Sequence, residues 1–108
     1  MSIQDGDQFF QKDNFNAAIR AYNNEIKKYA DPEKYPNSSI DYYEIATAIK
    51  KRADVYAEKA KRETDLDNRE HFATKAICDY TTTIALHDKS SSDLYQDCEN
   101  GIALMNKL

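Results

Sequence analysis

Histidine and cysteine are the side chains here with the widest chemistry, and their spacing forms no catalytic or metal-binding motif. His71 and His87 lie sixteen positions apart near opposite ends of one predicted helix, and neither has a Cys or carboxylate at zinc-ligand spacing. Cys78 falls opposite the main apolar stripe of its helix, whereas Cys98 lies within a stripe. We expect surface histidines and a buried Cys98 that packs as a small hydrophobe, with a reactive pair or a disulfide as the alternative.

Other sequence motifs of catalysis are missing as well. Residues 65–69 resemble a calcium loop only faintly, because they lack the turn glycine and the distal glutamate. The sequence has no glycine-rich phosphate loop and no serine-centred elbow. We therefore expect a protein that is not an enzyme and that uses no cofactor and no metal.

Composition limits the classes of protein that remain. The chain has 108 residues, a formal net charge of −4, two Gly, two Pro and two Cys. That length fits one small domain. Four Gly and Pro residues are too few for the turns of a many-stranded sheet. The acidic balance argues against nucleic acid as a partner, and no apolar run is long enough for a membrane. Without a signal peptide or a disulfide framework, a cytoplasmic location is expected.

Apolar residues recur at spacings of three and four along most of the chain, which predicts an all-α fold. Asp13 or Asn14 can cap the second helix, and Ser38 or Ser39 the third. Asp67 and Glu70 have the spacing of a capping box at the start of the fourth helix. The expected helices are 3–12, 14–30, a long third helix at 40–62, a fourth that ends near residue 87, and a fifth within 93–108.

The first two predicted helices resemble a tetratricopeptide repeat (TPR). That family places a small residue and an aromatic on the first helix, then a turn, then an aromatic, an alanine and another aromatic at fixed spacing. The residues at these places, without a gap, are Gly6, Phe9, Phe15, Ala18 and Tyr22. The small residues would let two helix backbones approach while the aromatics fill the space around them.

A looser second copy includes Arg52, Ala53 and Tyr56, followed by residues 76–86. It carries an insertion of about a dozen residues relative to the roughly 34-residue unit. The resemblance divides the single domain into a first repeat at 1–32, an extended second repeat at 39–88 and a capping helix at 93–108. The chain departs from the family at Glu25 and Thr83, where small alanines are usual, and at Asp13, which replaces a turn glycine but tolerates left-handed geometry.

The resemblance implies an antiparallel helix-turn-helix scaffold whose first helices line a concave groove for a partner peptide or helix. The corresponding positions in this chain are Ile3, Asp7, Phe10, Gln11, Lys50, Lys51, Asp54, Ala57 and Glu58. TPR proteins that grip chaperone C-terminal carboxylates use a Lys and an Asn on the first helix and an Asn on the third. This chain has Ile3, Asp7 and Lys51 there, so no carboxylate clamp is expected.

Three other interpretations stay open from the sequence. An unrelated helical bundle, for example a three-helix module of the microtubule-interacting-and-trafficking type, shows a similar aromatic–Ala–aromatic signature. A chain with only two repeats could complete its core as a homodimer, through the helix that carries residues 81–83 or through the last helix. The basic residues 50–52 could also bind an anion or RNA, although the acids interleaved with them favour a solvated, ion-paired surface.

Overall fold

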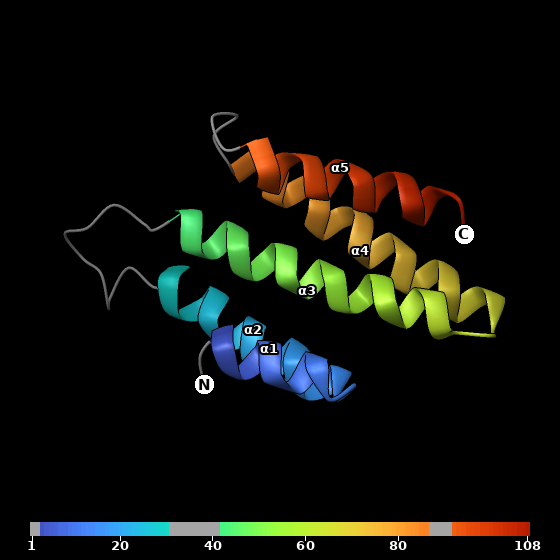
Figure 1. Ribbon diagram of the computed structural model, residues 1–108, viewed down its shortest axis with the longest axis horizontal. Helices are drawn as coiled ribbons and strands as arrows, with labels where there is room; N and C mark the ends of the chain where they lie inside the picture. Colours follow the sequence, from blue (N-terminus) through green and yellow to red (C-terminus); the bar gives the residue numbers. More distant parts are fainter. Residues whose placement is uncertain (1–2, 31–41, 87–91) are drawn as a thin grey trace.

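The computed structural model describes residues 3–30, 42–86 and 92–108, and this part of the chain folds into helices without strands (Figure 1). The all-α prediction and the long third helix are therefore confirmed. The predicted caps Ser38 and Ser39, and the end of the fourth helix at His87, lie outside the described residues. The helices are α1 (Ile3–Gln11), α2 (Phe15–Ala30), α3 (Tyr42–Arg62), α4 (Leu66–Leu86) and α5 (Ser92–Asn106).

The turn between α1 and α2 ends the first helix with a left-handed residue. Asp13 has φ of 60°. Its N–H donates to the carbonyl of Phe10 at 3.0 Å, and the N–H of Asn14 donates to the carbonyl of Phe9 at 2.8 Å. This pair of bonds is the Schellman arrangement, which satisfies carbonyls that the helix end leaves free. The expectation that Asp13 can replace the turn glycine is confirmed.

The start of α4 differs from the sequence prediction. The backbone N–H of Asn68 donates to the Asp65 carboxylate at 3.0 Å, which makes Asp65 the capping residue. The predicted capping box of Asp67 and Glu70 is wrong, because α4 begins at Leu66 and places Asp67 inside the first turn. Two aspartates two positions apart give nearly the same capping signal, and the tight connection from α3 selects the earlier one.

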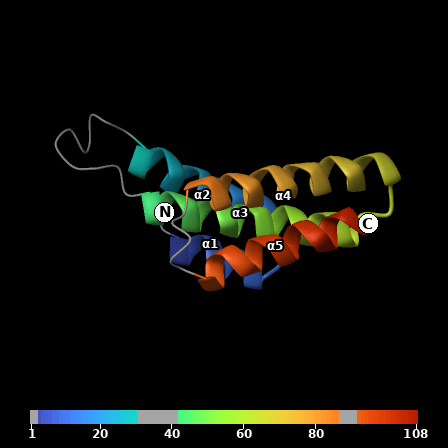
Figure 2. The ribbon, with the colours of Figure 1, turned by 90° about the horizontal axis from the view of Figure 1, so that it is seen from above.

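Helix α3 lies at the centre of the molecule, with one helix pair on each flank. Helices α1 and α2 pack together on one flank, and α4 and α5 pack together on the other (Figure 1). Viewed at right angles, α2 and α4 share one side of α3, while α1 and α5 share the opposite side (Figure 2). The structure measures 46 × 29 × 21 Å. Helix α3 therefore contributes side chains to two separate faces.

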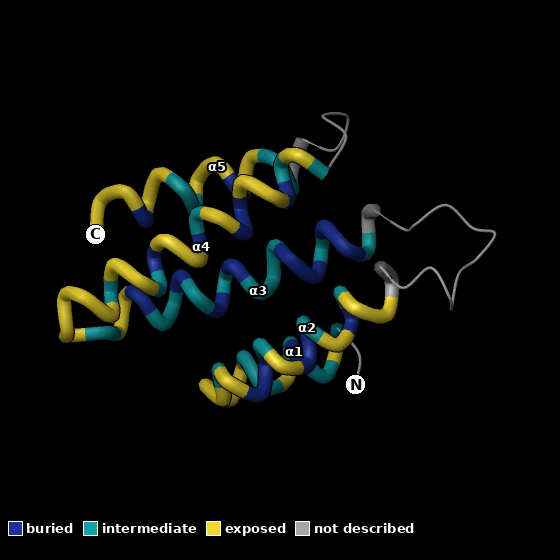
Figure 3. Tube along the Cα trace, turned by 180° about the vertical axis from the view of Figure 1, so that it is seen from behind, coloured by how far each residue is buried: buried dark blue, intermediate teal, exposed yellow. Residues whose placement is uncertain are grey.

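Small residues allow the other helices to approach α3 closely. Its buried positions continue along most of its length (Figure 3), and its fully buried alanines are Ala46, Ala48, Ala53 and Ala60. One apolar cluster joins α3 to α4 and α5 around Tyr80, and a second joins α1, α2 and Val55 of α3 around Tyr22. Alanine seams of this kind bring helix axes close while the large aromatics fill the remaining volume.

The two positions at which this chain departs from the small alanines usual in TPR proteins are both interior. Thr83 is fully buried, and its hydroxyl donates to the carbonyl of Asp79 at 2.9 Å. Glu25 is 4% exposed. The protein interior therefore contains a polar side chain at both positions. None of the helices, over the residues described, combines the length and apolar character required to cross a membrane.

Candidate functional site

Two buried tyrosines make the same kind of hydrogen bond in the two halves of the molecule. The Tyr22 hydroxyl on α2 donates to Asp7 on α1 at 2.5 Å, and the Tyr80 hydroxyl on α4 donates to Asp54 on α3 at 2.6 Å. Burial raises the pKa of each tyrosine well above its usual range, and the neighbouring carboxylate raises it further. Both hydroxyls therefore keep their protons and hold the two carboxylates in fixed positions.

A glycine lies against the ring of each tyrosine. A Cβ atom built on Gly6 would be 2.5 Å from Cε1 of Tyr22, and one built on Gly101 would be 2.6 Å from Cε2 of Tyr80. Only a residue without a side chain fits these places. Each aromatic ring can therefore pack directly against the backbone of a neighbouring helix, and its hydroxyl reaches a carboxylate.

Lysines of α3 pair with the same two carboxylates. Nζ of Lys51 lies 2.8 Å from Asp7, and Nζ of Lys50 lies 2.8 Å from Asp54. Burial lowers the pKa of Lys50, but the hydrogen bond and charge of Asp54 outweigh this effect, so the net pKa is raised. Four of the residues predicted from the sequence are thus brought together into two ion pairs, which we call the paired-charge face: Asp7, Lys50, Lys51 and Asp54.

The other predicted groove residues divide between packing and solvent. Ile3 and Phe10 pack against the apolar cluster around Tyr22, and the Phe10 ring meets the Phe15 ring edge-on with centroids 5.8 Å apart. Gln11 is exposed at the end of α1. Glu58 pairs along its own helix with Arg62 at 3.1 Å. The prediction that Ala57 lines the groove is wrong, because Ala57 is buried in the apolar cluster around Tyr80. Of this set, Gln11 and Glu58 place polar side chains at the surface.

Sequence reasoning missed a polar contact that joins three helices on the opposite side of α3. The Arg52 guanidinium donates to both carboxylate oxygens of Asp79 on α4 at 2.8 Å, and to Oδ1 of Asn23 on α2 at 2.8 Å. The bidentate bond to Asp79 is the main reason that the pKa of Arg52 is raised. The sequence groups Arg52 with its basic neighbours, and only the three-dimensional arrangement separates it from Lys50 and Lys51.

The cysteines occupy the environments expected from the helical pattern. Both thiols are free in the structure, with Cys78 exposed and Cys98 buried, so the disulfide alternative is not realised. Burial raises the pKa of Cys98 to about 11. Across the described residues, no cluster of His, Cys, Asp and Glu could hold a metal ion.

Comparisons with protein-family models, with curated proteins and with solved structures give no match for this chain. Function must therefore be inferred from the helices and their faces. The strongest local features are the paired-charge face on one side of α3 and the Arg52 contact on the other.

Proposed function

We propose that this chain is a non-enzymatic protein–protein interaction module that resembles two tetratricopeptide repeats with a terminal helix. Its paired-charge face binds a peptide or helix of a partner protein, without a carboxylate clamp. The observation that carries the proposal is the repeated contact in which a buried tyrosine positions a carboxylate beside a lysine, once in each half.

The repeated contact supports binding because it holds charge in place at the surface. Lys51 and Asp7 keep 31% and 35% of their side-chain surface exposed, so a ligand can reach both charges. Side chains fixed before binding lose less conformational entropy when a ligand arrives. Alternating cations and anions favour a partner segment that also carries both signs, since each of its charges then meets an opposite one.

Site-specific photo-crosslinking tests this face without disturbing the buried contacts. Benzoylphenylalanine is placed at the exposed Gln11, and a matched control carries it at the exposed Asn68 in the first turn of α4. In a lysate of the source cells, we expect discrete protein adducts from Gln11 that are absent from Asn68. Adding Lys50→Gln/Lys51→Gln should remove those adducts while circular dichroism shows unchanged helix content.

Two results would contradict the proposal. Identical adducts from both crosslinker positions would mean that capture is non-specific. Adducts from Gln11 that survive the double lysine substitution would mean that the paired-charge face takes no part in recognition.

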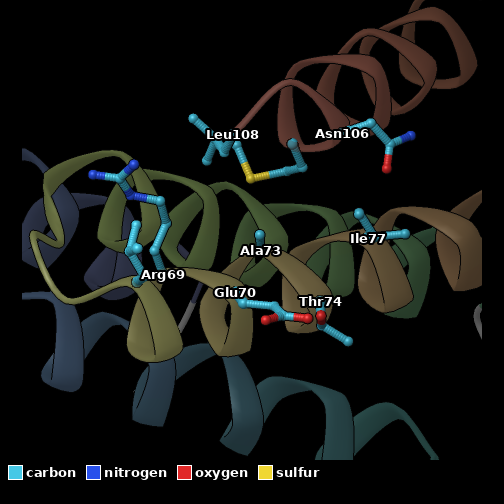
Figure 4. A pocket seen from close by; sticks show the side chains of 9 residues that line it. Arg69, Glu70, Ala73, Thr74, Ile77, Asn106 and Leu108 are labelled. Carbon is cyan, nitrogen blue, oxygen red and sulfur yellow. The ribbon is translucent and has the colours of Figure 1, made fainter.

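A second candidate function is self-association, and exposed leucines favour it. Leu66 is 74% and Leu108 is 45% exposed, and both line a depression of about 480 Å³ between the start of α4 and the end of α5. Figure 4 shows Ala73 and Ile77 of α4 on one side of the depression and Leu108 on the other. In a homodimer, a second copy would cover these exposed leucines through the last helix.

Sedimentation equilibrium distinguishes this candidate from a monomeric interaction module. A dimer that dissociates in Leu66→Lys/Leu108→Lys, but not in the control Leu104→Lys, would support self-association through the depression. A wild-type chain that stays monomeric at high concentration would remove this candidate and leave the peptide-binding proposal unaffected.

A further inference from the structure

A separate groove lies on the side of α3 that α2 and α4 share, opposite the side occupied by α1 and α5 (Figure 2). It has a volume of about 420 Å³. Arg52 and Tyr56 of α3 form its floor, Asn23 of α2 forms one wall, and residues of α4 form the other. A second depression of about 290 Å³ shares Asn23 and is lined by residues of α2 together with Phe9 of α1. We call the two depressions together the α2–α4 groove.

The charges of this groove oppose those of the whole chain. Its lining includes Arg20 and Lys27 from α2, Arg52 from α3 and Lys75 from α4. Of the described residues that line it, Asp79 alone carries a carboxylate, and Arg52 already binds both of its oxygens. The chain as a whole has a net charge of −4, so this concentration of positive charge is local.

Aromatic rings of α3 and α4 hold two lysines in place: Lys75, which lines the groove, and Lys59, which does not. Nζ of Lys75 lies 5.5 Å from the centroid of the Tyr56 ring. One turn further along α3, Nζ of Lys59 lies 4.6 Å from the Phe72 ring and donates to Oδ1 of Asn16 at 3.1 Å. Cation–π contacts of this kind orient the ammonium groups before a ligand arrives.

The cation–π contacts argue against single-stranded nucleic acid as the ligand of this groove. Proteins that bind single-stranded nucleic acid use open aromatic faces on which bases stack. Here lysines cover the Tyr56 and Phe72 rings, so these rings are poor stacking platforms, and the remaining chemistry is attraction of negative charge. Two cations are also spaced along α2: Arg20 and Lys27 lie seven positions apart, about 10 Å along a helix. An extended peptide covers that length with about three residues.

We propose that the α2–α4 groove binds an acidic segment of a partner protein, with several Asp or Glu side chains in a short stretch. The lining cations Arg20, Lys27 and Lys75 meet its carboxylates, while Arg52 stays bound to Asp79. This surface is distinct from the paired-charge face, so either site can fail while the other stands.

Fluorescence anisotropy with a labelled octapeptide of alternating Glu and Ala tests the proposal, with the Gln-for-Glu peptide as ligand control. The groove variant is Arg20→Glu/Lys75→Glu. The matched control is Lys12→Glu/Lys107→Glu, which changes the net charge equally at two exposed positions outside the groove. We expect at least about tenfold weaker binding in the groove variant, and a change of less than about threefold in the control. Circular dichroism verifies that both variants keep their helix content.

The exposed thiol of Cys78, which lines the groove, reports where the peptide binds. The Glu peptide should slow its alkylation by the neutral reagent iodoacetamide, and the Gln peptide should not, while the buried Cys98 stays unreactive. Equal loss of affinity in the two double variants, an unchanged alkylation rate at saturating peptide, or tighter binding of a single-stranded oligonucleotide of the same charge would each overturn the proposal.

Discussion

At the scale of single residues, the tyrosines and the glycines that face them explain how two apolar clusters carry polar groups at their edges. Each ring fills space between helices, and its hydroxyl binds a carboxylate at the boundary with solvent. The sequence indicated that Gly6 and Ala18 allow close helix packing around aromatics. It did not indicate the tyrosine–aspartate bonds, because the hydroxyl's partner depends on how far α1 and α3 are rotated about their axes.

Substitution of either glycine by alanine should destabilise the protein, although alanine favours helices. The new Cβ in Gly6→Ala would clash with the ring of the fully buried Tyr22, and the one in Gly101→Ala with the ring of Tyr80. Overpacking costs about 1–3 kcal/mol, against about 1 kcal/mol gained in helix propensity. Urea denaturation should show lower midpoints for both variants than for the exposed control Gln96→Ala. A higher midpoint for Gly6→Ala would contradict the packing described for Tyr22.

Stability should fall at alkaline pH because buried groups keep their protons in the folded state. The pKa of Cys98 is raised to about 11, and those of Tyr22 and Tyr80 are raised further. As pH rises, the unfolded chain releases these protons first. The free energy of unfolding should therefore be constant near neutral pH and fall above about pH 9.

Urea titrations across this pH range measure the effect, with Cys98→Ala as the comparison. Since that variant lacks the thiol, the difference in unfolding free energy between wild type and variant should narrow as pH rises from about 9 to 11. A difference that stays constant over this range would show that the folded state does not hold the thiol proton more tightly.

At the scale of elements, the polar contact around Arg52 joins α2, α3 and α4 in one place. The helix positions themselves followed from apolar spacing, with ends within a residue or two of prediction wherever the structure describes them. The contacts between helices could not be predicted from apolar spacing. Asp79 and Asn23 are separated from Arg52 by many residues, and no periodic pattern relates them to it. The cap of α4 was misplaced for a local reason, because Asp65 and Asp67 give nearly the same capping signal.

A double-mutant cycle should show strong coupling between Arg52 and Asp79. These side chains are 25% and 11% exposed, and hydrogen bonds to charged groups at such sites contribute about 1.5–3 kcal/mol. The variants Arg52→Met, Asp79→Ala and their combination give the coupling by urea denaturation. The exposed pair Arg62 and Asp13, at 3.0 Å, is the control and should show little coupling. Equal coupling in the two pairs would contradict the structural role assigned to Arg52.

At the scale of the whole molecule, stability should be highest in the central helix. Helix α3 is enclosed by both flanking pairs, whereas α1 packs mainly on α2, and α5 packs mainly on α4. Fully buried residues such as Ala53 and Val55 place its backbone far from water.

Hydrogen exchange of backbone amides should reflect this order. We expect the slowest exchange in the middle of α3, and faster exchange in α1 and in the second half of α5, because local opening there disrupts fewer packed side chains. Mass spectrometry of peptides after exchange measures the order directly. Protection of α5 equal to that of α3 would contradict the central position assigned to α3, or would indicate that a second copy covers α5.

The whole-molecule arrangement was only partly accessible from sequence. The groove residues of α1 and α3 were expected from the resemblance to TPR proteins, and four of them do form two ion pairs, because regular helices fix which side chains share a face. The α2–α4 groove was not foreseen, since Arg20 and Lys75 belong to helices that share no local pattern. How these two helices are placed relative to each other depends on the angles at which they cross α3.

Helix α3 presents Lys50, Lys51 and Asp54 toward one face, and Arg52, Tyr56 and Lys59 toward the other. A helix with its side chains is about 10–12 Å across. Two ligand segments, one bound at each face, would therefore be separated by little more than the diameter of one helix. If both belong to one ligand, the first contact raises the effective concentration of the second, so two weak attachments act as a tight one. If they belong to different proteins, this small chain would hold the two proteins close together.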